Sequence, residues 1–181
     1  REDFVDVFLE LNTYDGELFG LPTTPATTAL HWNKKLFREA GLDPERPPRT
    51  LAELDEMARK LTKTDENGHL IQAGFIPAEP GWWPWAWPYW FGGKIWDGEN
   101  ITFNTPEGLA AFRWVQSYTE RYGADELRRF QSSTAGNFAT PQNAFFTGRV
   151  AMVLQGVWLA TFISQYAPDL EWGAAPFPSA V

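Results

Sequence analysis

The stretch TTALHWNKKLFREAG, residues 27–41, changes from strand-type to helix-type sequence near its midpoint. Thr27–Trp32 is rich in β-branched and aromatic residues, which predicts a strand. Lys34–Ala40 predicts a short helix, and Gly41 ends it because glycine adopts the left-handed conformation without strain. Strands and helices mixed in this way with local hairpins predict an α/β or α+β lobe and argue against a doubly wound nucleotide-binding fold.

The same alternation returns near the end of the chain. Arg149–Gln155 predicts a buried strand, and Gly156-Val157-Trp158 opens a helix that ends before Pro168. Glu171–Ala175 then predicts a final strand. The chain therefore closes with the same kind of elements with which the fold begins.

Threonines mark three predicted helix starts. Thr50 with Glu53 three residues later forms a capping box, ahead of an apolar i, i+3, i+4, i+7 pattern that reaches about residue 62. Thr105-Pro106 starts a long helix to Tyr122, and its predicted buried side includes Leu109 and Phe112. Thr140-Pro141 repeats the signal and predicts a helix ending at Gly148.

Composition excludes several classes of protein. The 181 residues carry 15 Lys and Arg against 23 Asp and Glu, a net charge of −8, which argues against binding to nucleic acid or anionic membranes. The absence of Cys excludes disulfide scaffolds, zinc ribbons and thiol catalysis. The sequence starts without Met and without a basic and apolar leader, and we interpret it as a fragment of something longer.

The segment EPGWWPWAWPYWFGG, residues 79–93, is the most informative one for function. Pro84 and Pro88 argue against a regular helix, so a kinked, partly helical segment is expected. Some of its indoles will be in the core, but the five are too bulky to pack on one side of one element. Flat aromatic faces beside hydrogen-bonding groups suit sugar rings, and Glu79 is placed to accept from ligand hydroxyls or to pair within a loop. These indoles belong to Trp82, Trp83, Trp85, Trp87 and Trp90.

Enzyme motifs are sparse. The sequence contains no phosphate-cradling glycine loop and no Gly-x-Ser-x-Gly elbow. His31 and His69 lack a second ligand at metal-site spacing, so we interpret both as structural residues. Asp97, in an Asp-Gly turn, reads as a solvated turn carboxylate, whereas Glu79 stays a candidate acid or base of a carbohydrate-active enzyme.

The ordered set of short motifs resembles the extracellular solute-binding proteins of ABC transporters, in the sugar-binding group similar to maltose-binding protein. The likeness runs from about Asp15 to Pro178, and each piece is weak alone. Its pieces are DG at 15–16, GLP at 20–22, LHWNK at 30–34, LF at 36–37, AGL at 40–42, PP at 47–48, Thr50 before the helix with Leu54, FGG at 91–93, NTPEG at 104–108, FTGRVAM at 146–152, GVW at 156–158 and AP at 175–176.

The resemblance implies a type II periplasmic-binding-protein fold, in which two α/β lobes close on a ligand. It implies that this chain is mostly the second lobe, with helices around a small mixed sheet. Residues 1–26 would form the end of the first lobe and the hinge that crosses to the second lobe. Residues 27–173 would form the second lobe, and residues 174–181 would return toward the first lobe. By the same resemblance the ligand-binding residues are Trp158, Glu79, Trp82, Trp83, Trp85 and Gly156.

The resulting expectation is a non-enzymatic receptor that captures a sugar or oligosaccharide in the cleft and delivers it to a membrane permease. It would need no metal and no cofactor, and it would lie outside the cytoplasm, in the periplasm or as a surface-anchored lipoprotein. Two alternatives stay open: a carbohydrate-active enzyme fragment using Glu79, and an aromatic-rich protein-interaction domain.

Overall fold

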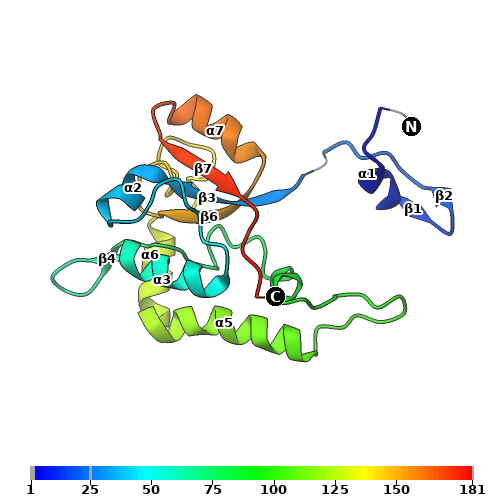
Figure 1. Cartoon of the computed structure of the whole chain (residues 1–181), viewed down its shortest axis with the longest axis horizontal. Helices are drawn as coiled ribbons and strands as arrows, with labels where there is room; N and C mark the ends of the chain where they lie inside the picture. The colour runs from blue at the N-terminus through cyan, green and yellow to red at the C-terminus, as the bar shows by residue number, and fades with distance from the viewer. Residues whose placement is uncertain (1–2, 25, 181) are drawn as a thin grey trace.

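A three-stranded antiparallel sheet organises the main body of the protein (Figure 1). The structure is a computed structural model and describes residues 3–24 and 26–180. β3 (Thr28–Asn33) lies between β6 (Met152–Gly156) and β7 (Trp172–Ala175). Leu30 of β3 is opposite Leu154 of β6 on one side and Ala175 of β7 on the other. All three predicted strands are confirmed, and they pair antiparallel; an isolated parallel bridge joins Ala73 to Val150 outside these strands.

The sheet separates two apolar clusters because successive side chains of a strand point to opposite faces. Met152 and Leu154 belong to one cluster, with β3 and helices α3 (Leu51–Leu61) and α5 (Pro106–Tyr122). Val153, between them, belongs to the other cluster, with Leu159 of α7 (Trp158–Tyr166). In Figure 1, α7 accordingly covers one face of the sheet and α3 and α5 cover the other. The core is thus two layers that share β6.

Helix starts follow the predicted caps. The Thr50 hydroxyl accepts from the Glu53 backbone N–H at 3.1 Å and the Thr105 hydroxyl from Gly108 N–H at 3.1 Å. The return bond of the capping box is shifted by one residue, since the Glu53 carboxylate accepts from Arg49 N–H at 2.9 Å. The short helix after β3 is also confirmed as α2 (Lys34–Glu39).

The predicted buried side of α5 is wrong at two positions. Leu109 is 50% exposed and Phe112 is 41% exposed. The helix instead buries Ala111 and Tyr118. This face is selected because the Tyr118 hydroxyl and the Trp114 indole both donate to Asp55 of α3.

The helix predicted for Thr140–Gly148 is also wrong, because this segment forms a series of turns. The Asn143 side chain accounts for the difference. Its amide donates to Phe138 O at 2.6 Å, and its carbonyl oxygen accepts from Phe145 N–H at 2.9 Å. Local side-chain bonds of this kind compete with the helical backbone ladder.

The Trp-rich segment is kinked and only partly helical, as predicted. α4 (Trp87–Trp90) is its single helical turn. The rings of Trp87 and Trp90 pack on Phe177 at centroid distances of 5.8 and 5.1 Å, so they belong to the core. α1 (Asp6–Glu10) and the hairpin of β1 (Thr13–Tyr14) and β2 (Glu17–Leu18) lie apart from the main body in Figure 1.

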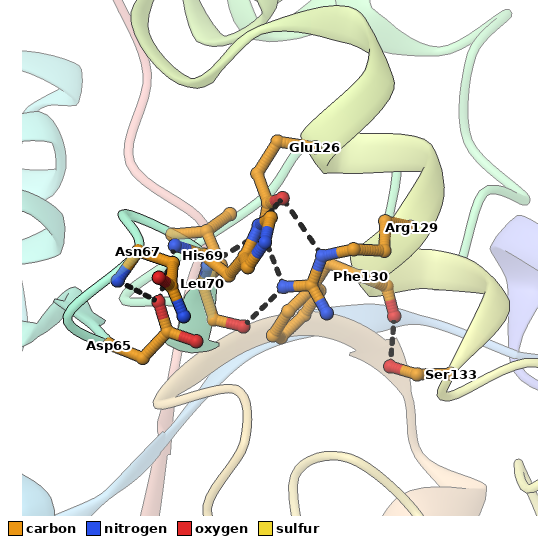
Figure 2. A network of polar contacts seen from close by, with 8 residues as sticks. All are labelled: Asp65, Asn67, His69, Leu70, Glu126, Arg129, Phe130 and Ser133. Carbon is orange, nitrogen blue, oxygen red and sulfur yellow. Dashed lines mark hydrogen bonds and ion pairs between the residues drawn. The ribbon is translucent and has the colours of Figure 1, made fainter.

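α6 (Ala124–Ser132), which the sequence analysis did not identify, is fastened to the β4–β5 hairpin (Lys63–Thr64 and Leu70–Gln72). Figure 2 shows the fastening: the Glu126 carboxylate accepts from Arg129 Nε at 2.8 Å and from Leu70 N–H at 2.6 Å, and contacts His69 Nδ1 at 2.9 Å. Arg129 also donates to Leu70 O at 3.0 Å. The hydrogen bond from Arg129, followed by those from His69 and Leu70, lowers the pKa of Glu126 to about 2.

This network predicts a stability change in acid. Because the folded-state pKa of Glu126 lies below its unfolded value near 4.5, its contribution is complete above about pH 4.5 and is lost as the pH falls toward about 2. Glu126→Gln should therefore be less stable than the parent protein at pH 6 and approach it near pH 2. Urea unfolding at a series of pH values measures this, with Glu66→Gln in the exposed hairpin turn as the matched control. A constant difference across the whole pH range would contradict the proposed role of the charge.

Candidate functional site

Four aromatic rings from three distant segments meet beside the end of β6. Trp83 and Trp158 lie nearly parallel, 18° apart, with ring centroids at 6.4 Å. Trp82 contacts Trp158 at 6.1 Å and Phe138 at 4.4 Å. Trp82 is 43% exposed, and the other three rings are half-buried. We call the rings of Trp82, Trp83, Phe138 and Trp158 the aromatic platform.

Gly156 explains the position of Trp158. The indole folds back from the first residue of α7 over the last residue of β6, and a Cβ atom on Gly156 would meet the ring at 2.4 Å. The indole N–H donates to the side-chain oxygen of Gln155, itself buried, at 3.1 Å. The bare backbone of Gly156 therefore makes room for the Trp158 ring, and we call it the seat of Trp158. Gly156 offers no side chain to a ligand.

Trp83 is held to the same strand. Its indole N–H donates to Leu154 O at 3.1 Å, which joins the Trp-rich segment to β6. The indoles of Trp83 and Trp158 are thus both hydrogen-bonded to β6, the strand that contributes to both core layers. The platform is anchored by hydrogen bonds and close packing, so the rings are held in place before any ligand arrives.

A polar cavity of about 330 Å³ adjoins the platform and shares Trp82 and Phe138 with it. One wall is residues 79–82, and the other is the end of α6 with the loop that follows. The Gln131 side chain joins the two walls by donating to Ala78 O at 2.9 Å. The remaining lining residues of the cavity are Glu79, Pro80, Gln131, Thr134, Ala135, Gly136, Asn137, Asn143 and Ala144.

Glu79 is the single charged residue among the described residues that line the polar cavity. Burial raises the pKa of its carboxyl to about 6. Within residues 3–24 and 26–180, no hydrogen bond or ion pair reaches this carboxylate. It is a hydrogen-bond acceptor without a partner, facing a space of ligand size.

The sequence-predicted site residues are brought together with one exception. Glu79, Trp82, Trp83, Trp158 and Gly156 all lie at the platform or its cavity. Trp85 does not: it is 55% exposed, and its ring meets that of Tyr89 at 6.5 Å.

The sequence analysis missed the second wall of the cavity. Gln131, Asn137 and Phe138 come from α6 and the loop 133–143. The signal was present in the polar run QSSTAGN, residues 131–137, which precedes an isolated Phe. No local pattern, however, places this loop opposite residue 79.

The histidines take the structural roles predicted for them. His31 is buried in β3, contacts Ala29 O at 3.1 Å and packs on Trp172, and burial lowers its pKa to about 4. His69 belongs to the Glu126 network in Figure 2. Over the part of the chain that the structure describes, no group of three or more His, Cys, Asp or Glu residues is arranged to hold a metal ion.

Comparison with known proteins identifies the family of this fold and site. The model of the bacterial extracellular solute-binding protein family matches residues 2–181. The chain belongs to that family. A solved binding protein with mannobiose bound, CpMnBP1, is 36% identical with a TM-score of 0.87, and the alignment covers 98% of this chain and 45% of that one. The solute-binding fold is therefore established for this lobe.

Two curated relatives differ in ligand. The maltodextrin-binding protein MdxE of Bacillus subtilis is 25% identical, covering 98% of this chain and 41% of that protein. The sn-glycerol-3-phosphate-binding periplasmic protein UgpB of Escherichia coli is 27% identical, covering 90% of this chain and 36% of that protein. The chain thus spans less than half the length of these relatives. No helix among the described residues is long and apolar enough to cross a membrane.

The seat of Trp158 gives a direct prediction. Gly156→Ala should displace the indole and destabilise the protein by roughly 1–3 kcal/mol, the usual cost of overpacking. Chemical denaturation measures the loss, and the NMR signal of the Trp158 indole N–H reports the displacement. Gly20→Ala is the control, because a Cβ there meets its nearest atom at an ordinary 3.4 Å. An unmoved indole signal in Gly156→Ala would contradict the proposed seat.

Proposed function

We propose that this chain is the ligand-binding lobe of a carbohydrate receptor that serves an ABC importer. The observation that carries the proposal is the aromatic platform beside a cavity that holds an unpartnered carboxylate. Aromatic rings stack on the C–H faces of a sugar ring, and the polar side chains that line the cavity can hydrogen-bond its hydroxyls. One solved relative of this chain has mannobiose bound, and another relative is named a maltodextrin-binding protein.

The charge of the cavity favours a sugar over a phosphoester. A phosphate group is normally recognised by Arg, Lys or a helix N-terminus. Among described lining residues the cavity contains Glu79 and no Arg, Lys or His. A glycerol phosphate placed there would meet a carboxylate, so the ligand class of UgpB does not suit this lobe.

The proposed receptor has two lobes. In this proposal residues 1–26 end the first lobe and cross from it to the second lobe. Residues 27–173 form the second lobe, and residues 174–181 turn back toward the first lobe. The hairpin that stands apart from the main body in Figure 1 supports a boundary before β3. The partner would be a membrane permease, and the protein would be extracytoplasmic, either in the periplasm or as a lipoprotein anchored at the cell surface.

The two alternative functions find less support. A glycosidase needs two carboxyl groups on either side of the scissile bond, and Glu79 is the single carboxylate among described residues of the cavity. Asp97 is occupied by its own turn, accepting from Glu99 N–H at 2.8 Å and Asn100 N–H at 2.7 Å. An interaction domain would present its indoles outward, whereas Trp83 and Trp158 are half-buried and hydrogen-bonded to residues of β6. We therefore propose a receptor without enzymatic activity.

Loss of the platform should weaken sugar binding in the complete receptor. Trp158→Ala is expected to reduce affinity by roughly 1–3 kcal/mol, about 5- to 150-fold, as for a buried aromatic contact. Calorimetric titration with mannobiose measures it, and Trp96→Ala, an exposed indole outside the platform, is the control. If Trp158→Ala lowers only the melting temperature, Trp158 is a core residue alone.

Loss of the Glu79 carboxylate tests the role of the cavity in ligand binding. Glu79→Gln keeps the shape and should cost on the order of 1.5–3 kcal/mol of binding, the value of a hydrogen bond to a charged group. The ionised carboxylate is the acceptor, so parental affinity should fall as the pH drops through about 6, whereas Glu79→Gln should show no such step. Glu99→Gln controls for net charge. Hydrolysis of an oligosaccharide that Glu79→Gln abolishes while binding persists would instead support the enzyme.

The present chain should bind sugar weakly by itself. If each lobe supplies about half of a micromolar binding free energy near −8 kcal/mol, about −4 kcal/mol remains, which corresponds to millimolar affinity. NMR titration of the 181-residue chain with saccharides measures this. Micromolar saturation would show that the site is complete within this chain. It would refute a binding site that is shared between two lobes.

A further inference from the structure

The turn that joins β4 to β5 contains a chemically reactive pair of residues, Asn67-Gly68. Asn67 is the one asparagine in the sequence that is followed by glycine. Asparagine is among the least heat-stable residues of proteins, and it reacts when the next backbone nitrogen reaches its side-chain carbonyl carbon. Glycine leaves that nitrogen unshielded because it has no Cβ atom. The turn therefore supplies both the carbon that is attacked and an accessible attacking nitrogen.

The structure presents this pair to solvent at the tip of the β4–β5 hairpin. Asn67 and Gly68 are both exposed, and the side-chain amide of Asn67 has no hydrogen-bond partner among the residues the structure describes. Gly68 has a φ of +82°, a left-handed conformation that glycine adopts without strain. A Cβ atom placed on Gly68 would meet nothing within 4 Å. The tip therefore has space for the Asn67 side chain to turn toward the Gly68 nitrogen.

Hydrogen bonds within the turn oppose this reaction. The Gly68 N–H donates to Asp65 O at 3.0 Å. The Asp65 carboxylate accepts from Asn67 N–H at 2.9 Å and from His69 N–H at 2.8 Å. The bond to Asp65 O must open before the Gly68 nitrogen can attack, so the rate depends on how often the turn opens.

The contact with α6 restrains the same turn. The Glu126 carboxylate accepts from the backbone N–H of Leu70 and contacts the ring of His69, the residue that directly follows Gly68 (Figure 2). Local opening is less frequent where a segment is held by more contacts. Removing the Glu126 carboxylate should therefore let the turn open more often.

We propose that Asn67 is a site of spontaneous modification and that the contact with Glu126 limits its rate. The backbone nitrogen of Gly68 forms a bond to the side-chain carbonyl carbon of Asn67 as the bond from that carbon to the side-chain nitrogen breaks. The side-chain nitrogen leaves as ammonia with the proton of the Gly68 amide, and a succinimide ring remains. Water then opens the ring at either carbonyl carbon, returns a proton to the Gly68 nitrogen and leaves aspartate or isoaspartate. Either product adds a negative charge beside Asp65 and Glu66.

Incubation of the full 181-residue chain at neutral pH tests the site, with peptide mass spectrometry as the measurement. Asn100 is the internal reference, because it is exposed, its N–H donates to Asp97 in a similar turn, and isoleucine follows it. Asn67 should convert to a mixture of aspartate and isoaspartate while Asn100 stays intact. Gly68→Ala should slow the conversion, and Asn67→Gln, which keeps the glycine, should remain unmodified over the same period.

Three further variants test the contact with α6. Glu126→Gln should speed the conversion of Asn67 severalfold. Glu17→Gln, which removes the same charge from an exposed residue of the β1–β2 hairpin, should leave the rate unchanged. Gly156→Ala, expected to destabilise the fold away from this turn, should also leave the rate unchanged because the reaction needs only local opening.

The outcomes separate the two parts of the proposal. If Asn67 survives as long as Asn100 in the parent protein, the modification site is refuted. If Asn67 converts at the same rate in Glu126→Gln as in the parent protein, the site stands and the role of Glu126 is refuted. If Gly156→Ala speeds the conversion as much as Glu126→Gln does, the reaction proceeds from the unfolded chain, and the role of Glu126 is again refuted.

Discussion

The close approach of the Trp158 indole to the bare backbone of Gly156 is the constraint on which the site depends. It requires a glycine as the last residue of β6 and a helix that starts two residues later, at Trp158. β6 can supply that end point because its register with β3 is fixed, with Thr28 opposite Gly156. Slipping the strand by one residue would exchange Val153 with its neighbours between the two core layers. The burial of the sheet thus determines where the platform is built.

Much of the fold could be predicted because its signals are local. The strand before Asn33, the capped start at Thr50 and the Thr105-Pro106 start each depend on residues within one turn of the chain, and all three are confirmed. One failure involves a choice made at longer range, and the other involves a local competition within a loop. The buried face of α5 is decided by Asp55, which lies on another helix, and the loop after Thr140 is decided by the side chain of Asn143.

The site shows the same division between local and distant information. The aromatic half could be predicted because the indoles are crowded into one short segment and Trp158 follows a glycine. The polar half could not, because α6 and its loop reach residue 79 only through contacts such as the bond from Gln131 to Ala78. A sequence pattern shows which side chains are available for a ligand, but not which of them face each other across a cavity.

Glu126 and Glu79, near opposite ends of α6, are two carboxylates in opposite environments. Glu126, in the first turn of α6, is surrounded by donors, and this holds its pKa near 2 and keeps it charged at neutral pH as part of the framework. Glu79 faces the other end of the same helix across the cavity, and burial without a partner raises its pKa to about 6. A carboxylate whose donors are all in the protein has little left to offer a ligand. One left without donors in a partly buried wall is poised to gain from any hydroxyl that enters, since the group is already desolvated and the ligand restores its hydrogen bonds. The contrast between these two carboxylates is therefore a physical reason to place the ligand at the Glu79 end of α6 rather than at the Glu126 end.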